Sequence, residues 1–488
     1  MMAVTINKHA YNFFIFILKQ RRSDKGRGER GGNNGAITAF IHLPCPIAIT
    51  AILLHKPAPA LAPTSFIQCI NRIMMMSTVD VCVIGAGLSG ACIARNLASH
   101  NKSVLVLDAR NRVGGRLLTA AAANVDLGGA DFGGAWIWPR SEPNMANLLQ
   151  NLNIQTVPMH MDGISMAYIA NGKRHVIPDG QAEMYAACGG GAIRVCGGAS
   201  RVVSELLESH SVRLGMRVTE IDYNDKKEVK IKCIEMTDKN NNTNKNDTPT
   251  IIKCQAVVLA APPKVLARTI TFLPNLPKQK TESMIATPTW MQEYGKVAVS
   301  FPTNWWRQQR MSGISIDHVG AVATWWEACS GSEGDGNLPT LAGFVTEQGA
   351  AMLRKLICDD SSYLFEFIIE SLKRVYGVDA NAMGTLESVA SNEIKVQGSS
   401  EQDGLIVTNG VITVSYKSWL EDDLTNAKDD TVVDFTCDYG DRDLQSSVEP
   451  LFFAGTETAA GAHGHMEGAV IAAERAATEV VEYLSNCT

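Results

Sequence analysis

The chain has 488 residues, 45% of them hydrophobic and 19% charged, which allows two or more globular domains and excludes general disorder. The 44 basic and 50 acidic side chains give a net charge of -6, and no basic stripe with interleaved aromatic residues occurs, so we expect no nucleic-acid partner. The 12 cysteines are scattered without CxxC pairs, which argues against a zinc site or a disulfide framework.

Residues 1–76 differ in composition from the rest, and we exclude them from the fold as an N-terminal extension or a targeting segment. An apolar stretch at 37–54 is interrupted by two prolines, which weakens a transmembrane interpretation. Part of it resembles a signal-peptide core with cleavage near Ala62; alternatively, translation starts near Met74. The expected compartment is cytoplasmic for a start near Met74, and organellar or secretory otherwise, with membrane association limited to this segment.

A complete βαβ pattern opens the remaining chain. An apolar, β-branched run at 81–84 predicts a buried parallel strand, and a helix-compatible segment follows and ends near residues 100–101. Residues 103–107 predict a second strand. The first strand runs directly into a glycine-rich turn, which is the order that a dinucleotide-binding unit requires.

Four residues of this unit carry the dinucleotide hypothesis. Gly85 permits the tight turn, Gly87 lets the backbone approach a pyrophosphate, and Gly90 lets the helix pack closely on the strand. The helix N-terminus supplies N–H groups for the pyrophosphate, and Asp108 ends the second strand where it could accept hydrogen bonds from ribose hydroxyls. The alternative is a glycine turn in an ordinary βαβ unit.

A second glycine turn follows, with Arg116 after Gly114 and Gly115. The guanidinium group of Arg116 could reach back over a bound pyrophosphate, for which its planar fork is well matched. A solvated arginine in a loop would leave the same pattern.

Three segments together resemble the flavin-containing amine oxidases, a group that includes monoamine, polyamine and bacterial amine oxidases. They are VIGAGLSG, LDARNRVGGR and VDLGGADFGGAWIWP, and later segments such as AGTET and MEGA continue the resemblance. It implies an α/β fold in which a discontinuous Rossmann-type FAD-binding domain accompanies a mixed α+β substrate domain. The implied ranges are 77–158, 194–274 and 419–488 for the FAD domain, 159–193 for a cap segment and 275–418 for the substrate domain.

The resemblance also implies which residues contact FAD. They are Gly85, Gly87, Ser89, Gly90, Asp108, Ala109, Gly115, Arg116, Gly134, Ala135, Trp136, Val218, Trp419, Gly455, Glu457, His465 and Met466. The helix that begins near Met466 would direct its positive end toward the flavin. For Trp136 and Trp138, plain core packing is the competing interpretation.

Further elements are expected between these segments. In chain order they are a helix at 143–152, a short strand at 153–158, an irregular cap at 159–193, a helix ending near 209, one strand at 212–221, a polar loop at 238–250, a third parallel strand at 256–260 and a C-terminal helix to 484. We predict that a strand within 291–301 carries Lys296 at its mouth.

We assign catalytic roles to Lys296, Trp419 and His465. The resemblance implies that Lys296 holds a water molecule against the flavin and that Trp419 forms a wall of the site. Lysine is also a common residue on exposed edge strands, which is the alternative for Lys296.

Two departures from the family limit the functional inference. Residues 422–434 contain no cysteine where monoamine oxidases attach their flavin, so we expect FAD to be bound non-covalently. The two tyrosines that flank the substrate in those enzymes correspond to a position near Asp429 and to His465, so the cage is missing. An imidazole at His465 could accept a substrate proton near neutral pH, or it could simply hydrogen-bond the cofactor.

The sequence thus predicts an FAD-dependent oxidoreductase that oxidises a small amine to an imine or aldehyde, with oxygen as acceptor and release of hydrogen peroxide. Monoamines, polyamines and amino acids all remain open as substrates. Two alternatives keep the same cofactor frame: an enzyme that acts on a non-amine substrate, like a desaturase or a porphyrinogen oxidase, and a flavin-binding protein without turnover.

Overall fold

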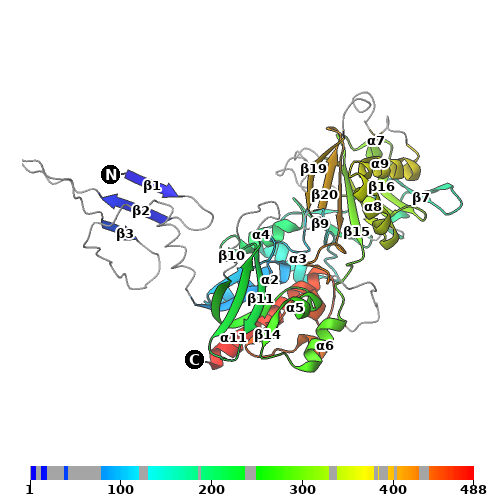
Figure 1. The fold of residues 1–488 in the computed structure, drawn as a ribbon. Helices are drawn as coiled ribbons and strands as arrows, with labels where there is room; N and C mark the ends of the chain where they lie inside the picture. The colour runs from blue at the N-terminus through cyan, green and yellow to red at the C-terminus, as the bar shows by residue number, and fades with distance from the viewer. Residues whose placement is uncertain are drawn as a thin grey trace, which may run out of the picture. The chain divides into compact units, whose positions relative to one another are not determined.

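The computed structural model describes residues 2–6, 13–18, 38–41, 78–119, 130–184, 188–236, 249–328, 338–378, 383, 394–400, 404–427 and 439–487. The chain separates into two units, 1–77 and 78–488. In the first unit, three short strands form an antiparallel sheet: β1 (Met2–Ile6), β2 (Phe13–Leu18) and β3 (Thr38–Ile41). The second unit contains two large sheets with helices packed on them (Figure 1).

The first large sheet has eight strands in the order β10-β5-β4-β13-β12-β11-β14, with β22 paired to β13. Strands β10, β5, β4, β13 and β22 pair with one another in parallel. Strand β12 pairs antiparallel with both β13 and β11, and β14 pairs parallel with β11. The strand bounds are β4 (Val79–Ile84), β5 (Val104–Leu107), β10 (Ser211–Arg213), β11 (Met216–Asp222), β12 (Val229–Glu235), β13 (Thr250–Leu259), β14 (Thr271–Leu273) and β22 (Leu451–Phe453).

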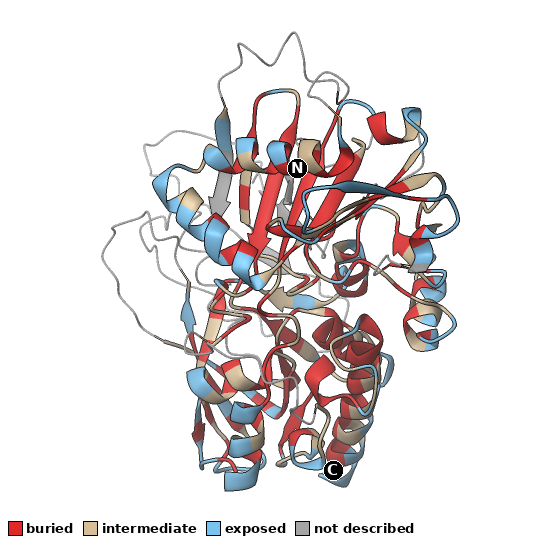
Figure 2. Ribbon diagram, turned by 90° about the vertical axis from the view of Figure 1, so that its right-hand side faces the viewer, coloured by how far each residue is buried: buried red, intermediate tan, exposed pale blue. Residues whose placement is uncertain are grey.

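The sequence of strand β4 is a continuous apolar run at 81–84 because the strand is buried there on both faces of the sheet. Val81 and Val83 face one hydrophobic cluster, whereas Cys82 and Ile84 face another on the opposite side of the sheet. A strand that is buried on both faces needs apolar residues at every position rather than at alternate ones. Figure 2 shows buried strands most plainly in the other large sheet, in the upper half of the view. The predicted strands at 81–84 and 103–107 are therefore present, joined by the predicted helix.

Helices cover both faces of this sheet. The first cluster lies under α2 (Leu88–Ser99), α3 (Pro143–Asn151), α4 (Ser200–Leu207) and α11 (Met466–Asn486). The second lies under α5 (Pro263–Thr269), α6 (Lys278–Ala286) and α10 (Arg442–Gln445). Helix α6 packs here through Met284, whereas the resemblance implies a substrate domain that begins at residue 275.

The second large sheet has nine strands in the order β19-β20-β21-β15-β18-β17-β16-β7-β8. Its strands are β7 (Ile164–Tyr168), β8 (Arg174–Ile177), β15 (Gly295–Ser300), β16 (Met311–Asp317), β17 (Val322–Glu327), β18 (Thr340–Val345), β19 (Lys395–Ser400), β20 (Gly404–Thr408) and β21 (Thr413–Ser418). Helices α7 (Trp305–Gln308), α8 (Glu347–Asp359) and α9 (Tyr363–Tyr376) pack on one face. Smaller elements are the strand pair β6 (Thr156–Pro158) and β9 (Ile193–Val195) and the 3₁₀ turns η2 (Ala182–Met184) and η3 (Thr456–Thr458).

Three expectations differ from the structure. The segment 159–193 is not irregular, because β7 and β8 form a hairpin at the edge of the second sheet. Strand β8 is largely exposed and begins with charged residues, so it lacks the alternation that would have revealed it. The strand expected at 212–221 is two strands, which a turn at Gly215 (φ +68°) separates.

The third difference concerns the strand expected at 256–260. It begins at Thr250 as β13 and lies inside the first sheet, parallel to β4 and antiparallel to β12. The polar loop at 238–250 and the position near Asp429 fall outside the described residues, apart from residues 249 and 250. Across the ranges that the structure describes, none of the helices has both the length and the apolar character needed to span a bilayer.

Candidate cofactor and substrate site

One cavity of about 450 Å³ is lined by residues from both large sheets and from the loops between them. It begins at the glycine turn after β4 and includes Lys296 on β15 and Phe344 on β18. The predicted residues that line it are Gly85, Gly87, Ser89, Asp108, Ala109, Gly115, Arg116, Gly134, Ala135, Trp136, Val218, Lys296, Trp419, Gly455, His465 and Met466. Tertiary structure therefore brings together segments that are far apart in the sequence.

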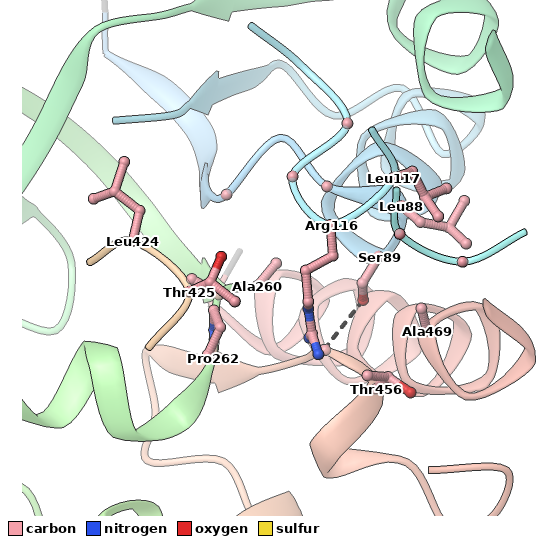
Figure 3. Close-up of a pocket in the computed structure, with 18 of the residues that line it drawn as sticks. Leu88, Ser89, Arg116, Leu117, Ala260, Pro262, Leu424, Thr425, Thr456 and Ala469 are labelled. Carbon is pink, nitrogen blue, oxygen red and sulfur yellow. Dashed lines mark hydrogen bonds between the residues drawn. The ribbon is translucent and has the colours of Figure 1, made fainter. Parts of the chain in front are cut away.

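At one end of the cavity, the N-terminus of α2 opens onto empty space. Gly87 is the N-cap of this helix, and a Cβ atom added to it would meet only Gly114 O, at 3.9 Å. Ser89 in the first turn accepts a hydrogen bond from Gly455 N at 3.2 Å, which connects α2 to the turn after β22 (Figure 3). Free N–H groups and empty space at a helix N-terminus are suited to an anion such as a pyrophosphate.

Asp108 lies at the end of β5, as the sequence predicts. Its carboxylate accepts hydrogen bonds from Ala86 N and from Arg110 N, both at 2.8 Å. These bonds orient the side chain toward the glycine turn, and each oxygen retains acceptor capacity for a hydroxyl group. Ala109 and Val218 line the cavity beside it, Val218 from strand β11.

Two predicted cofactor contacts do not line the cavity. A Cβ atom on Gly90 would lie 1.9 Å from Gly85 O, so this glycine is required for close packing of α2 on the turn. Glu457 is fully buried and holds Arg116 through two hydrogen bonds, Nη1 to Oε1 at 2.6 Å and Nη2 to Oε2 at 2.9 Å. Glu457 thus contacts the cavity wall through Arg116, which extends toward the Thr456 segment in Figure 3, and through Trp290 N at 3.4 Å.

Lys296 lies on a central strand with β21 and β18 as neighbours, so the edge-strand interpretation is wrong. Its ammonium group donates hydrogen bonds to Gly133 O at 2.6 Å and to Asp131 O at 3.2 Å. Aromatic rings surround it, with centroids 5.6 Å away at Trp136, 5.5 Å at Trp326 and 5.1 Å at Phe344.

Burial of this ammonium group changes its titration. Desolvation lowers the pKa of Lys296 to about 8, against the opposing effect of the nearby Asp131 carboxylate. A buried amine with a lowered pKa, held by two carbonyl groups at the wall of a cavity, has the character of a functional group rather than a solvated surface residue.

Tryptophans also wall the cavity around Lys296, a part of the cavity that we call the aromatic end. Trp136 lines the cavity in edge-to-face contact with Trp326, and its indole N–H is buried without a partner. Trp419 also lines it and donates its indole N–H to Phe132 O at 2.9 Å. A Cβ atom on Gly134 would meet the side chain of Met466 at 3.2 Å, so Gly134 allows the first residue of α11 to approach.

His465 precedes α11 and also lines the cavity. Its Nδ1 atom lies 2.6 Å from Glu142 Oε1. The hydrogen bond to Glu142 raises the pKa of His465, while partial burial opposes the shift. Glu142 was missed by the sequence analysis because it precedes Pro143 at an ordinary helix start, and no local pattern connects it with a residue 323 positions away.

Further aromatic residues of the cavity were also missed, among them Phe132, Trp290, Tyr294 and Phe344. Nothing in their local sequence distinguishes them from core aromatics. The described residues contain no group of three or more His, Cys, Asp or Glu side chains that could hold a metal ion.

These features together fit an elongated flavin nucleotide. The oriented Asp108 carboxylate is suited to a ribose, and the space at Gly87 is suited to a pyrophosphate. Several aromatic rings line the other end of the cavity. A ligand smaller than a flavin nucleotide would not need one cavity that extends from the glycine turn to the aromatic end.

Comparisons with known proteins agree with this geometry. Residues 180–481 match the family described as flavin containing amine oxidoreductase, and residues 83–152 match an NAD(P)-binding Rossmann-like domain. The flavin-containing amine oxidase A of Sus scrofa is 24% identical, over 83% of this chain and 85% of the relative.

Two solved structures share the fold. Cyclohexylamine oxidase from Brevibacterium oxydans IH-35A superposes with a TM-score of 0.60 at 18% identity, covering 84% of this chain and all (100%) of that one. A putrescine oxidase bound to putrescine gives a TM-score of 0.58 at 18% identity, with 83% and 99% of the two chains covered.

Proposed function

Because the chain belongs to the family of flavin-containing amine oxidoreductases, we propose that it binds FAD non-covalently and oxidises a small amine with oxygen as the electron acceptor. The observation that carries this proposal is the continuity of one cavity from the glycine turn after β4 to the aromatic walls around Lys296. Bound FAD would supply the two-electron oxidation of the amine to an imine, which water hydrolyses, and hydrogen peroxide would form on reoxidation.

Different residues of the cavity would bind different parts of FAD. Gly87 and Ser89 would hold the pyrophosphate at the N-terminus of α2, with Arg116 beside it. Asp108 would bind the adenosine ribose. None of the described residues that line the cavity is a cysteine, which supports non-covalent attachment.

At the other end, the protein would exclude water and hold protons. Trp136 and Trp419 wall the site, and Lys296 would hold a water molecule beside the flavin. His465 faces the same cavity and would accept a proton from the substrate.

The test uses the purified full chain. We would record its visible spectrum, precipitate the protein with acid, and measure peroxide release with monoamines, diamines, polyamines and amino acids. Yellow colour in the acid supernatant together with peroxide from one amine class is the expected result. Flavin that stays with the pellet would contradict non-covalent binding. Released flavin that no amine reduces would instead favour a non-amine substrate or a flavin-binding protein without turnover.

A further inference from the structure

Glu142 connects two walls of the aromatic end of the cavity. Its Oε1 atom lies 2.6 Å from His465 Nδ1, and its Oε2 atom accepts a hydrogen bond from Trp138 N at 2.9 Å. The carboxylate is almost completely buried, with a side-chain exposure of 5%. Since both oxygens are engaged, Glu142 is placed to hold other groups rather than to react itself.

The starts of two helices are tied together reciprocally at this point. Glu142 is the N-cap residue of α3 and binds His465, the N-cap residue of α11. In return Glu467, in the first turn of α11, accepts hydrogen bonds from Asn144 N at 3.1 Å and from Met145 N at 2.7 Å at the start of α3. This double connection holds the two helix starts together, and the bond to Glu142 places the imidazole beside the start of α3.

The imidazole lies near two indole rings. Its centroid is 6.0 Å from that of Trp138 and 6.3 Å from that of Trp290, and all three residues line the cavity. We call Trp138, Trp290 and His465 the aromatic corner. The backbone of His465 is held as well, because Thr456 Oγ1 donates to His465 O at 2.9 Å.

Among the charged groups described near the aromatic corner, Glu142 is the one that hydrogen-bonds the imidazole of His465. Glu467 is occupied by the start of α3, and Glu457 faces Arg116 behind Trp290. His463 and Tyr439 stack on each other beside Trp290, and Lys296 lies on another wall of the cavity. The hydrogen bond to Glu142 is the first cause of the raised pKa of His465, and partial burial acts against it.

We propose that Glu142 is a positioning residue that keeps the Nδ1 proton of His465 directed at its carboxylate, so that Nε2 accepts a proton from the substrate ammonium group at the aromatic corner. The inference rests on the proposed function, which it deepens. An N–H bond of the ammonium group breaks and an Nε2–H bond forms, so the positive charge moves from substrate nitrogen to imidazolium, where Glu142 offsets it. The electron pair of the broken N–H bond stays on nitrogen, so the neutral amine has the lone pair that its oxidation requires.

This arrangement restricts the substrate class. Indole rings can attract a cation, and proton transfer to Nε2 requires at least one N–H bond on that cation. Primary, secondary and tertiary ammonium ions therefore meet both conditions, whereas a quaternary ammonium ion meets only the first. A quaternary analogue of a good substrate should bind and inhibit without reducing the flavin.

The first test measures the tautomer and the pKa of the His465 imidazole directly. Holoprotein labelled with ¹⁵N-histidine is titrated by NMR, and the His465 signals are assigned from their loss in His465→Gln. In the wild type we expect the Nδ1-protonated tautomer and a pKa above that of free histidine. In Glu142→Gln, where the amide can still accept a hydrogen bond but carries no charge, that pKa should fall by about one unit. Glu205→Gln, in an exposed ion pair with Arg201, is the matched control and should change neither quantity.

The second test follows the rate of anaerobic flavin reduction against pH. The acceptor is neutral imidazole, so the wild-type rate should rise through the pKa of His465. That acid limb should move to lower pH in Glu142→Gln, with a plateau at least about tenfold lower, and vanish in His465→Gln. An identical limb in wild type and Glu142→Gln would overturn the role of Glu142 while the proposed function stands. Failure of every amine to reduce the wild type would instead overturn the proposed function and the proton transfer with it, and the NMR titration would still report whether Glu142 holds the ring.

Discussion

Arg116 and Glu457 form a bidentate ion pair, with Nη1 2.6 Å from Oε1 and Nη2 2.9 Å from Oε2. The two residues are 341 positions apart in the chain. The carboxylate is fully buried, while the guanidinium group is partly open to the cavity. Glu457 thereby aims the guanidinium group at the place where we expect the pyrophosphate.

Glu457→Gln should weaken flavin binding at least about tenfold and lower the free energy of unfolding by about 2 kcal/mol, because a charge-assisted fork becomes a single neutral hydrogen bond. Flavin fluorescence during dilution measures the first effect and urea unfolding the second. Glu205→Gln, which breaks only an exposed pair, should leave both unchanged. Unaltered flavin affinity in Glu457→Gln would remove Arg116 from the binding site.

Gly87→Leu should yield a folded protein that retains no flavin. Gly87 has an ordinary φ of −80°, and a side chain there would enter the empty space at the N-terminus of α2. Gly90→Ala is the informative contrast, because its methyl group would collide with Gly85 O and should destabilise the fold itself. Circular dichroism and the flavin absorbance of the purified variants separate the two outcomes. A fully flavin-loaded Gly87→Leu protein would refute the pyrophosphate placement.

Lys296→Met should slow flavin reduction or reoxidation by about tenfold or more while flavin stays bound. Methionine fills the space of the lysine stem but cannot donate to Gly133 O or to a water molecule. Stopped-flow absorbance measures each half-reaction separately. Lys296→Arg, which restores a donor, is the comparison variant. Unchanged rates in both half-reactions would exclude the role assigned to Lys296.

A buried charge cluster that includes the cavity-lining Arg110 joins the two large sheets. Asp422 accepts hydrogen bonds from Arg110 Nη2 at 2.7 Å, after β5, and from Lys417 Nζ at 3.0 Å, on β21. Asp422→Ala would leave two buried cations without their carboxylate and should cost about 3–5 kcal/mol of unfolding free energy. The neighbouring Asp423→Ala breaks only a partly exposed pair with Arg217 and should cost less than about 1 kcal/mol. Equal urea midpoints for the two variants would contradict this assignment.

Lys280 provides a prediction about pH. Its buried ammonium group donates to Leu444 O at 2.7 Å and to Ser446 O at 2.8 Å, and desolvation lowers the pKa of Lys280 to about 7. Between that value and the ordinary lysine pKa of about 10.4, the unfolded chain binds a proton that the folded protein does not. The contribution of Lys280 to stability therefore rises with pH across this window.

Lys280→Met should accordingly lose more stability at pH 9.5 than at pH 6.5. Urea unfolding at the two pH values measures the difference, and Lys278→Met, which removes a neighbouring exposed lysine, serves as control. A loss that is the same at both pH values would mean that Lys280 titrates normally in the folded protein.

The sequence determined those parts of the protein that depend on local order. The apolar run of β4, the glycine turn after it and the acid at Asp108 lie within one βαβ unit, where backbone geometry alone dictates the residue types. The flavin-oxidase fold could be predicted because several such segments recur in order. The hairpin of β7 and β8 was missed because an exposed edge strand carries no apolar alternation.

Only the tertiary structure decided how the aromatic end of the cavity is built. Glu142 and His465 are 323 positions apart, and Lys296 reaches Gly133 across 163 positions. Such contacts leave no periodic signal, because each residue has an ordinary local context and its partner arrives only when separate sheets and helices pack. The sequence could nominate His465 and Lys296 one at a time, whereas the carboxylate that holds the first and the carbonyl groups and rings that enclose the second exist only in the folded chain.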